Sequence, residues 1–60
     1  MLDFVKKILQ KVSFDPLLFE KELKKGIRNL VDPQDVLKLQ RWCSQNFSTK
    51  YPTIINSSFA

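Results

Sequence analysis

The segment Ser13-Phe14-Asp15-Pro16-Leu17-Leu18-Phe19 decides how this chain folds. An aspartate before a helix accepts hydrogen bonds from the free backbone amides, and proline fits the first helical position because it has no amide to satisfy. The segment therefore predicts a tight corner and a helix that begins at Pro16. Phe14 and Phe19 have the spacing at which two side chains pack across a helix start as a hydrophobic staple.

A second corner, Val31-Asp32-Pro33, predicts another helix that begins at Pro33. Asp35 supports this start, because the positive end of a helix stabilises an acidic side chain in the first turn. The aspartates of the two corners lie 17 residues apart, but the sequences behind them diverge. We therefore interpret the corners as repeated start signals and not as a structural repeat.

Apolar residues recur at helical spacing on both sides of the corners. Before the first corner they fill one arc opposite the lysines: Met1, Leu2, Phe4, Val5, Ile8, Leu9 and Val12. After the second corner a narrower stripe is bordered by Leu37 and Trp42 and consists of Val36, Leu39, Cys43 and Phe47. The pattern predicts three amphipathic helices, over residues 2–12, 16–30 and 33–47.

Gly26 falls inside the predicted second helix. If the helix ended there in a Schellman motif, Ile27 would meet an apolar residue one turn back, where the chain has Lys21 and Glu22. We therefore continue the helix through Gly26, at a cost of about 1 kcal/mol relative to alanine, and expect a neighbouring helix to approach closely there. A hinge at Gly26 is the alternative.

Residues 48–60 are rich in Ser, Thr and Asn but contain the apolar residues Tyr51, Ile54, Ile55 and Phe59. We expect an irregular tail that docks in part. A short strand over 53–56 is the alternative, and a single strand would need another chain to pair with. The predicted fold is all-α: a compact three-helix mini-domain over residues 1–47, with short Asp-Pro corners and an irregular C-terminal segment.

The composition restricts the function. Sixty residues and 7.1 kDa leave room for one thin core and no second domain. The chain has no His, and its one Cys forms neither an internal disulfide nor a thiolate zinc site. Because Asp15 and Asp32 are explained as helix caps and Cys43 as a buried thiol, we expect no catalytic residue, no metal, no cofactor and no small-molecule substrate.

We expect a cytoplasmic protein. The N-terminus lacks the basic stretch, apolar run and cleavage site of a secretory signal. The longest unbroken apolar run, Leu17-Leu18-Phe19, is far shorter than the roughly 20 residues that cross a bilayer. An unpaired Cys43 fits a reducing compartment.

The leading functional expectation is a non-enzymatic protein-protein interaction module that self-associates or binds another protein. A thin core gains stability when a second surface covers exposed apolar residues. The expected contact residues are apolar and lie on the third helix and the tail: Leu37, Trp42, Tyr51, Ile54, Ile55 and Phe59.

The alternative is binding to nucleic acid or to an anionic membrane surface. The chain has a net charge of +4, and residues 1–31 hold seven cations against four acidic side chains. The cations lie opposite the apolar arcs of the first two helices: Lys6, Lys7, Lys11, Lys21, Lys24, Lys25 and Arg28. Such a face can bind phosphates, although lysine is also the common soluble residue on the outward face of an ordinary helix. A helix-turn-helix motif is a minor hypothesis, because Lys21 and Glu22 disfavour a turn at Gly26.

Overall fold

The computed structural model describes residues 2–59, which form four helices. These are α1 (Leu2–Lys11), α2 (Pro16–Asn29), α3 (Pro33–Phe47) and α4 (Pro52–Phe59). The all-α class is confirmed. The expectation of an irregular tail or a strand is wrong for the described residues, because a fourth helix stands in its place. Met1 and Ala60, which belong to the predicted first apolar arc and tail, lie outside the described residues.

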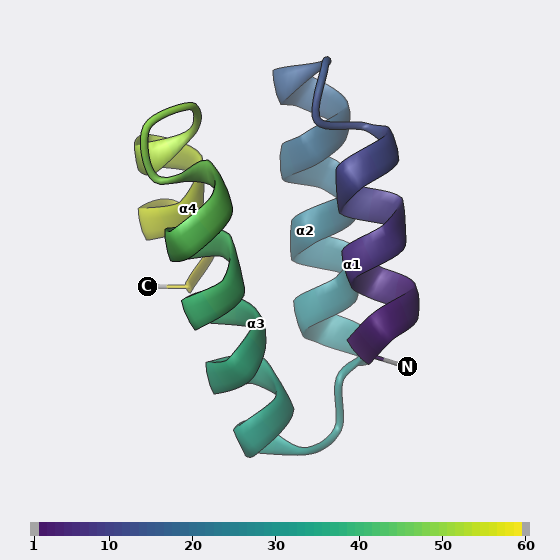
Figure 1. Ribbon diagram of the computed structural model, residues 1–60. Helices are drawn as coiled ribbons and strands as arrows, with labels where there is room; N and C mark the ends of the chain where they lie inside the picture. The colour runs from purple at the N-terminus through teal and green to yellow at the C-terminus, as the bar shows by residue number, and fades with distance from the viewer. Residues whose placement is uncertain (1, 60) are drawn as a thin grey trace.

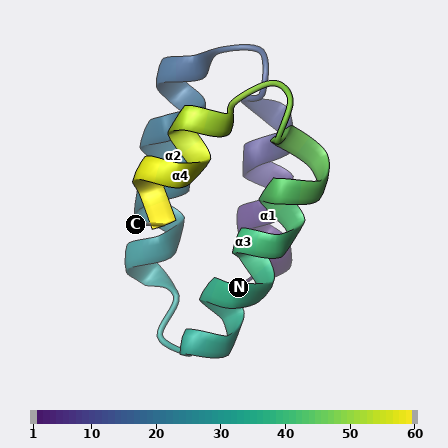
Figure 2. The ribbon, with the colours of Figure 1, turned by 90° about the vertical axis from the view of Figure 1, so that its left-hand side faces the viewer.

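The four helices form two antiparallel hairpins that pack against each other (Figures 1 and 2). One hairpin is α1 with α2 and the other is α3 with α4. Between the hairpins, α4 lies against α2 and α3 lies against α1. The described part of the chain measures 27 × 19 × 16 Å. Each helix therefore keeps one face toward the common core and one face toward solvent.

Both Asp-Pro corners act as helix starts. The Asp15 carboxylate accepts hydrogen bonds from the backbone amides of Leu17 (3.0 Å) and Leu18 (3.3 Å). The Asp32 carboxylate accepts one from the amide of Gln34 (2.9 Å). The predicted starts at Pro16 and Pro33 are confirmed. These bonds satisfy amides that have no partner within the helix.

The expected hydrophobic staple is absent from the first corner in the described structure. Phe19 is fully buried, whereas Phe14 is 74% exposed. The Phe14 ring therefore does not cover Phe19 in the way that a staple requires. Phe14 is instead an exposed aromatic residue at the end of the α1–α2 hairpin.

An aromatic cluster joins the two hairpins. The centre of the Phe19 ring lies 4.8 Å from the centre of the Phe47 ring, in an edge-on arrangement, and 4.7 Å from the centre of the Tyr51 ring. The centres of the Trp42 and Phe47 rings are 5.5 Å apart. Aliphatic side chains extend this core along the bundle: Val5, Leu9, Leu23, Leu30, Leu39 and Ile55, together with the Cys43 thiol. Phe19, on α2, is thus the central contact between elements that lie far apart in the sequence.

The fourth helix begins at Pro52, directly after Tyr51. Tyr51 is half-buried, and its hydroxyl donates a hydrogen bond to the backbone carbonyl of Ser13 in the α1–α2 corner. Ile55 is 4% exposed and belongs to the core. Tertiary packing of Tyr51 and Ile55 therefore stabilises a helix that local sequence preference alone does not predict.

Gly26 is a packing position. It lies within α2, and its φ angle is not positive, so a helix end or a left-handed conformation at Gly26 is excluded. A Cβ atom added there would lie 2.7 Å from Cγ1 of Val5 on α1. The missing side chain therefore allows α1 and α2 to approach each other, and the hinge alternative is not needed.

We expect Gly26→Ala to lower the free energy of unfolding by up to about 2 kcal/mol. Alanine gains about 1 kcal/mol of helix propensity, but overpacking against a stiff, buried β-branched side chain costs about 1–3 kcal/mol. In a Val5→Ala background the same change should instead stabilise the protein, because the clashing methyl is gone. Urea unfolding of the four proteins measures this coupling. A stabilising effect of equal size in both backgrounds would contradict the close approach.

Candidate functional site

The apolar residues expected to bind a partner are mostly used inside the fold. Ile55 is buried in the core. Trp42, Tyr51, Ile54 and Phe59 are half-buried and pack against that core. Leu37, at 58% exposed, is the one member of the predicted set that lies open on the described surface. The structure therefore does not present these six residues as a single free apolar surface.

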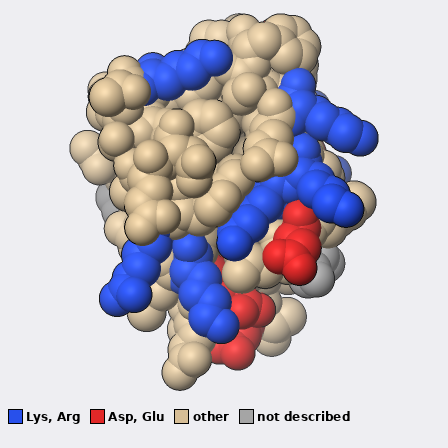
Figure 3. Space-filling model, in the orientation of Figure 1, with Lys and Arg blue, Asp and Glu red and all other residues tan. Residues whose placement is uncertain are grey.

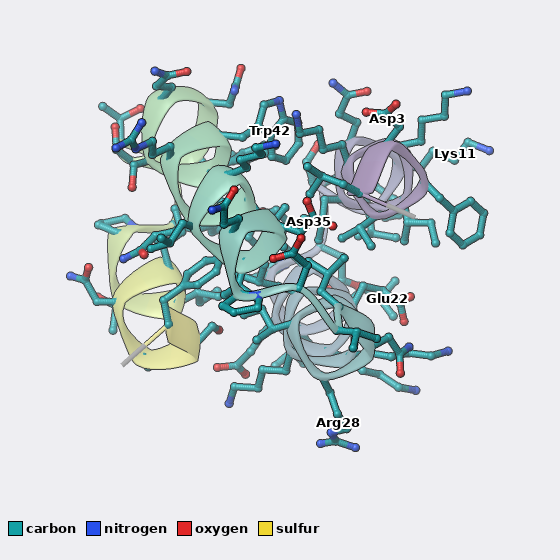
Figure 4. All side chains as sticks on the ribbon, turned by 90° about the horizontal axis from the view of Figure 1, so that it is seen from below. Asp3, Lys11, Glu22, Arg28, Asp35 and Trp42 are labelled. Carbon is teal, nitrogen blue, oxygen red and sulfur yellow. The ribbon has the colours of Figure 1, made fainter. Side chains whose placement is uncertain are left out.

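The seven predicted cations separate into two groups. Four of them line one shallow hollow on the outer face of α2: Lys21, Lys24, Lys25 and Arg28. On α1, Lys7 and Lys11 are exposed, while the Lys6 ammonium lies 5.8 Å from the centre of the Trp42 ring. Figure 4 shows Trp42 between α3 and α1, and Arg28 pointing away from the bundle on the α2 side. The basic hollow is therefore a property of α2 alone.

The hollow on α2 has a uniform charge. Its lining consists of the four cations and Asn29, and among residues 2–59 no carboxylate contributes to it. Lys24 pairs with Glu20 at the rim (3.5 Å), and both side chains are substantially exposed. Such an exposed pair contributes at most a few tenths of a kcal/mol, so Lys24 stays available to another anion. The opposite face of the molecule, seen in Figure 3, mixes basic and acidic side chains.

A groove between α1 and α2 adjoins the basic hollow. Lys25 and Asn29 line both features. The rest of the groove is mainly apolar and is lined by Phe4, Val5, Ile8, Glu22 and Gly26. Phe4 is 61% exposed. The α2 side of the molecule thus places apolar surface directly beside its cations.

Sequence reasoning missed the exposed apolar residues at the start of α2. Leu17 is 77% exposed, Leu18 is 39% exposed, and Phe14 precedes them in the corner. No role was predicted for Leu17 or Leu18, and the staple spacing predicted a structural role for Phe14. The available signal was helical position: Leu17, Lys21, Lys24 and Arg28 follow the spacing i, i+4, i+7, i+11, which places Leu17 on the basic face.

The groups that most resemble catalytic residues have structural roles. Asp15 and Asp32 cap α2 and α3. Burial raises the pKa of the Cys43 thiol to about 11, and the Lys6 ammonium offsets only part of this effect. The thiol therefore stays protonated at neutral pH, and the reactive thiolate is not formed. Among residues 2–59, no group of three or more His, Cys, Asp or Glu side chains is placed to hold a metal.

No family model, curated protein sequence or solved structure matches this chain. None of the helices within residues 2–59 has both the length and the apolar character needed to cross a membrane. The geometry of the surface therefore carries the functional proposal.

Proposed function

We propose that this protein is a non-enzymatic binding domain that holds a phosphate-bearing, polyanionic surface against α2. The observation that carries the proposal is the hollow lined by Lys21, Lys24, Lys25 and Arg28. Cations gathered on one helix face raise the local positive potential, which attracts anions and neutralises several phosphates together.

Two further observations support α2 over the other basic residues. Lys6 lies against Trp42 between α1 and α3, where a cation stabilises the fold by facing an aromatic ring. The Lys50 ammonium lies similarly over the Tyr51 ring, 5.5 Å from the ring centre. The α2 cations, in contrast, extend outward from a helix whose inward face is fully occupied by Phe19, Leu23 and Gly26.

The proposal predicts that Lys21→Glu/Arg28→Glu weakens binding to a polyanion by about 30-fold or more. Each basic residue near an anionic surface contributes about 1 kcal/mol, and 1.4 kcal/mol corresponds to a tenfold change in affinity. The probe is a fluorescently labelled heparin fragment, and its binding is followed by anisotropy. Both residues are exposed, so the fold should be retained.

The matched control is Lys38→Glu/Arg41→Glu on α3. Each double variant replaces two cations by two anions and changes the net charge from +4 to zero (+4 − 4 = 0). The two variants are compared in about 0.1 M salt, where a Debye length of about 10 Å screens charges on distant parts of the surface. Under these conditions we expect the α3 variant to bind within about threefold of the unmodified protein. Equal losses in the two variants would show a general charge effect and would overturn the assignment to α2.

Self-association is the second candidate, favoured by exposed apolar residues near the start of α3. Leu37 is 58% exposed and Val31 is 96% exposed. If these residues contact a second copy, sedimentation equilibrium over a hundredfold range of concentration will give a mass that rises above 7.1 kDa, and Leu37→Asp will abolish the rise. A constant monomer mass would remove this candidate and leave the α2 proposal unaffected.

A further inference from the structure

The outward face of α2 has an apolar end. Leu17 and Phe14 are about three-quarters exposed, and Leu18 beside them is 39% exposed. In Figure 3, uncharged side chains occupy the right-hand part of the top of the molecule, where the α1–α2 loop lies in Figure 1, and a basic side chain lies to their left. Large apolar side chains grouped on the surface mark a site that a membrane or another protein covers.

The backbone that carries these side chains is held in place by hydrogen bonds. The Asp15 carboxylate accepts from the amides of Leu17 and Leu18, and the Asp15 amide donates to the Val12 carbonyl (3.0 Å). The Ser13 carbonyl accepts from the Tyr51 hydroxyl of the other hairpin. Because both sides of the corner are fixed, Phe14 and Leu17 project outward without a local rearrangement that would bury them.

The apolar end and the basic hollow lie on one line along α2. Leu17, Lys21 and Arg28 share a face, and at 1.5 Å per residue this face extends about 16 Å from Leu17 to Arg28. Leu18 and Lys25, seven residues apart, lie on the adjacent line. A single helix face therefore combines residues that enter an apolar layer with residues that bind phosphates beside it.

We propose that this face binds the surface of a bilayer that contains anionic phospholipid, an inference that rests on the anion-binding function proposed above. The α2 axis lies along the membrane plane. Phe14, Leu17 and Leu18 enter the boundary between headgroups and acyl chains, and Lys21, Lys24, Lys25 and Arg28 contact the headgroup phosphates. Interfacial helices bind by this combination of apolar burial and attraction to anionic lipid.

The chemistry of the face favours a bilayer over a nucleic acid. A nucleic acid offers phosphates to the cations, but single strands are held chiefly by aromatic side chains that stack on bases. The α2 hollow is lined by no aromatic side chain among the described residues. Phe14 at the apolar end is aromatic, but along the chain Leu17 and Leu18 come between it and the cations. Leucine gains nothing from a phosphate backbone, whereas it gains free energy on leaving water for a lipid layer.

The first test compares binding to vesicles of equal parts phosphatidylglycerol and phosphatidylcholine with binding to vesicles of phosphatidylcholine alone. We expect the unmodified protein to prefer the anionic vesicles by at least about tenfold at low salt. Phe14→Ser/Leu17→Ser should lower the affinity for anionic vesicles by about tenfold or more but leave heparin affinity within about twofold. Lys21→Glu/Arg28→Glu should weaken binding to both probes.

The second test reports insertion directly. Leu17→Trp introduces an indole at the apolar end, while the native Trp42 lies between α1 and α3. In anionic vesicles with brominated acyl chains, the introduced indole should shift its emission to the blue and be quenched severalfold more than Trp42 in the unmodified protein. Equal quenching of the two proteins would overturn the proposal.

The remaining outcomes separate the two proposals. The anion-binding function is retained if the protein binds heparin or duplex DNA and Lys21→Glu/Arg28→Glu abolishes that binding. The bilayer inference is overturned if the protein shows no preference for anionic vesicles, or if Phe14→Ser/Leu17→Ser does not weaken vesicle binding. Failure of the unmodified protein to bind heparin, DNA and anionic vesicles at low salt would overturn both.

Discussion

Replacing Phe19 by alanine should lower the free energy of unfolding by about 3–5 kcal/mol. Phe19 is fully buried, and its ring contacts aromatic rings that arrive from α3 and from the start of α4. The substitution removes the transfer free energy of the ring and leaves a cavity between the two hairpins. At roughly 0.05–0.15 kcal/mol per residue, a chain of this length has a total stability of about 3–9 kcal/mol. The variant should therefore be largely unfolded or should melt more than about 12 °C lower.

Phe14→Ala is the matched control, since it removes the same atoms five residues earlier. Phe14 is 74% exposed, so its replacement should change the stability by no more than about 0.5 kcal/mol. Thermal unfolding followed by circular dichroism measures both variants. Similar losses in the two proteins would mean that the two rings form the staple that the sequence suggests, and would contradict an exposed Phe14 in the first corner.

Removing residues 51–60 should abolish cooperative folding. The shortened chain keeps α1, α2 and α3 but loses the Tyr51 ring against Phe19, the Tyr51 hydrogen bond to Ser13 and the buried Ile55 side chain. Burial of large side chains contributes about 1.5–3 kcal/mol each, so the loss approaches the whole stability of a small domain. Circular dichroism should show reduced helix content and a broad thermal transition.

Substitutions within the full chain show whether α4 acts through its buried face. Ile55→Asp places an unpaired charge in the core and should be nearly as disruptive as the deletion. Thr53→Asp, at an exposed position in the first turn of α4, should be neutral or slightly stabilising. A shortened chain that melts cooperatively at the same temperature as the full chain would support an independent three-helix domain over residues 1–47.

The sequence was sufficient where local chemistry determines structure. Asp-Pro pairs predict helix starts because the carboxylate and the proline each satisfy a requirement of the first turn. The starts of α2 and α3 and the end of α3 at Phe47 agree with prediction, and the ends of the first two helices differ by one residue. The same local reasoning predicted that Gly26 lies inside a helix and faces a neighbour.

The fourth helix could not be predicted by the same reasoning. Pro52 stands at its first position, as Pro16 and Pro33 do in α2 and α3, but Tyr51 supplies no capping carboxylate before it. The β-branched residues Thr53, Ile54 and Ile55 favour a strand when considered alone. Contacts with α2 and α3 make this segment helical, and such contacts cannot be inferred from a single sequence.

The candidate site was predicted in part. The periodicity of α2 placed Lys21, Lys24, Lys25 and Arg28 on one face, and the structure gathers them in one hollow. The same periodicity did not separate them from Lys6, because the relative rotation of α1 and α2 depends on packing. The exposed residue Phe14 was missed because its spacing from Phe19 predicts a staple. No role was predicted for Leu17, although its helical position places it on the basic face.

The most direct test of the anion-binding account is a titration of the isotopically labelled protein with a heparin fragment, followed residue by residue in amide NMR spectra. The account predicts salt-sensitive shifts concentrated between Lys21 and Asn29 on α2, with little change over α3 and α4. Shifts centred on Lys38, Arg41 or Lys50, or an unchanged spectrum at low salt, would contradict it.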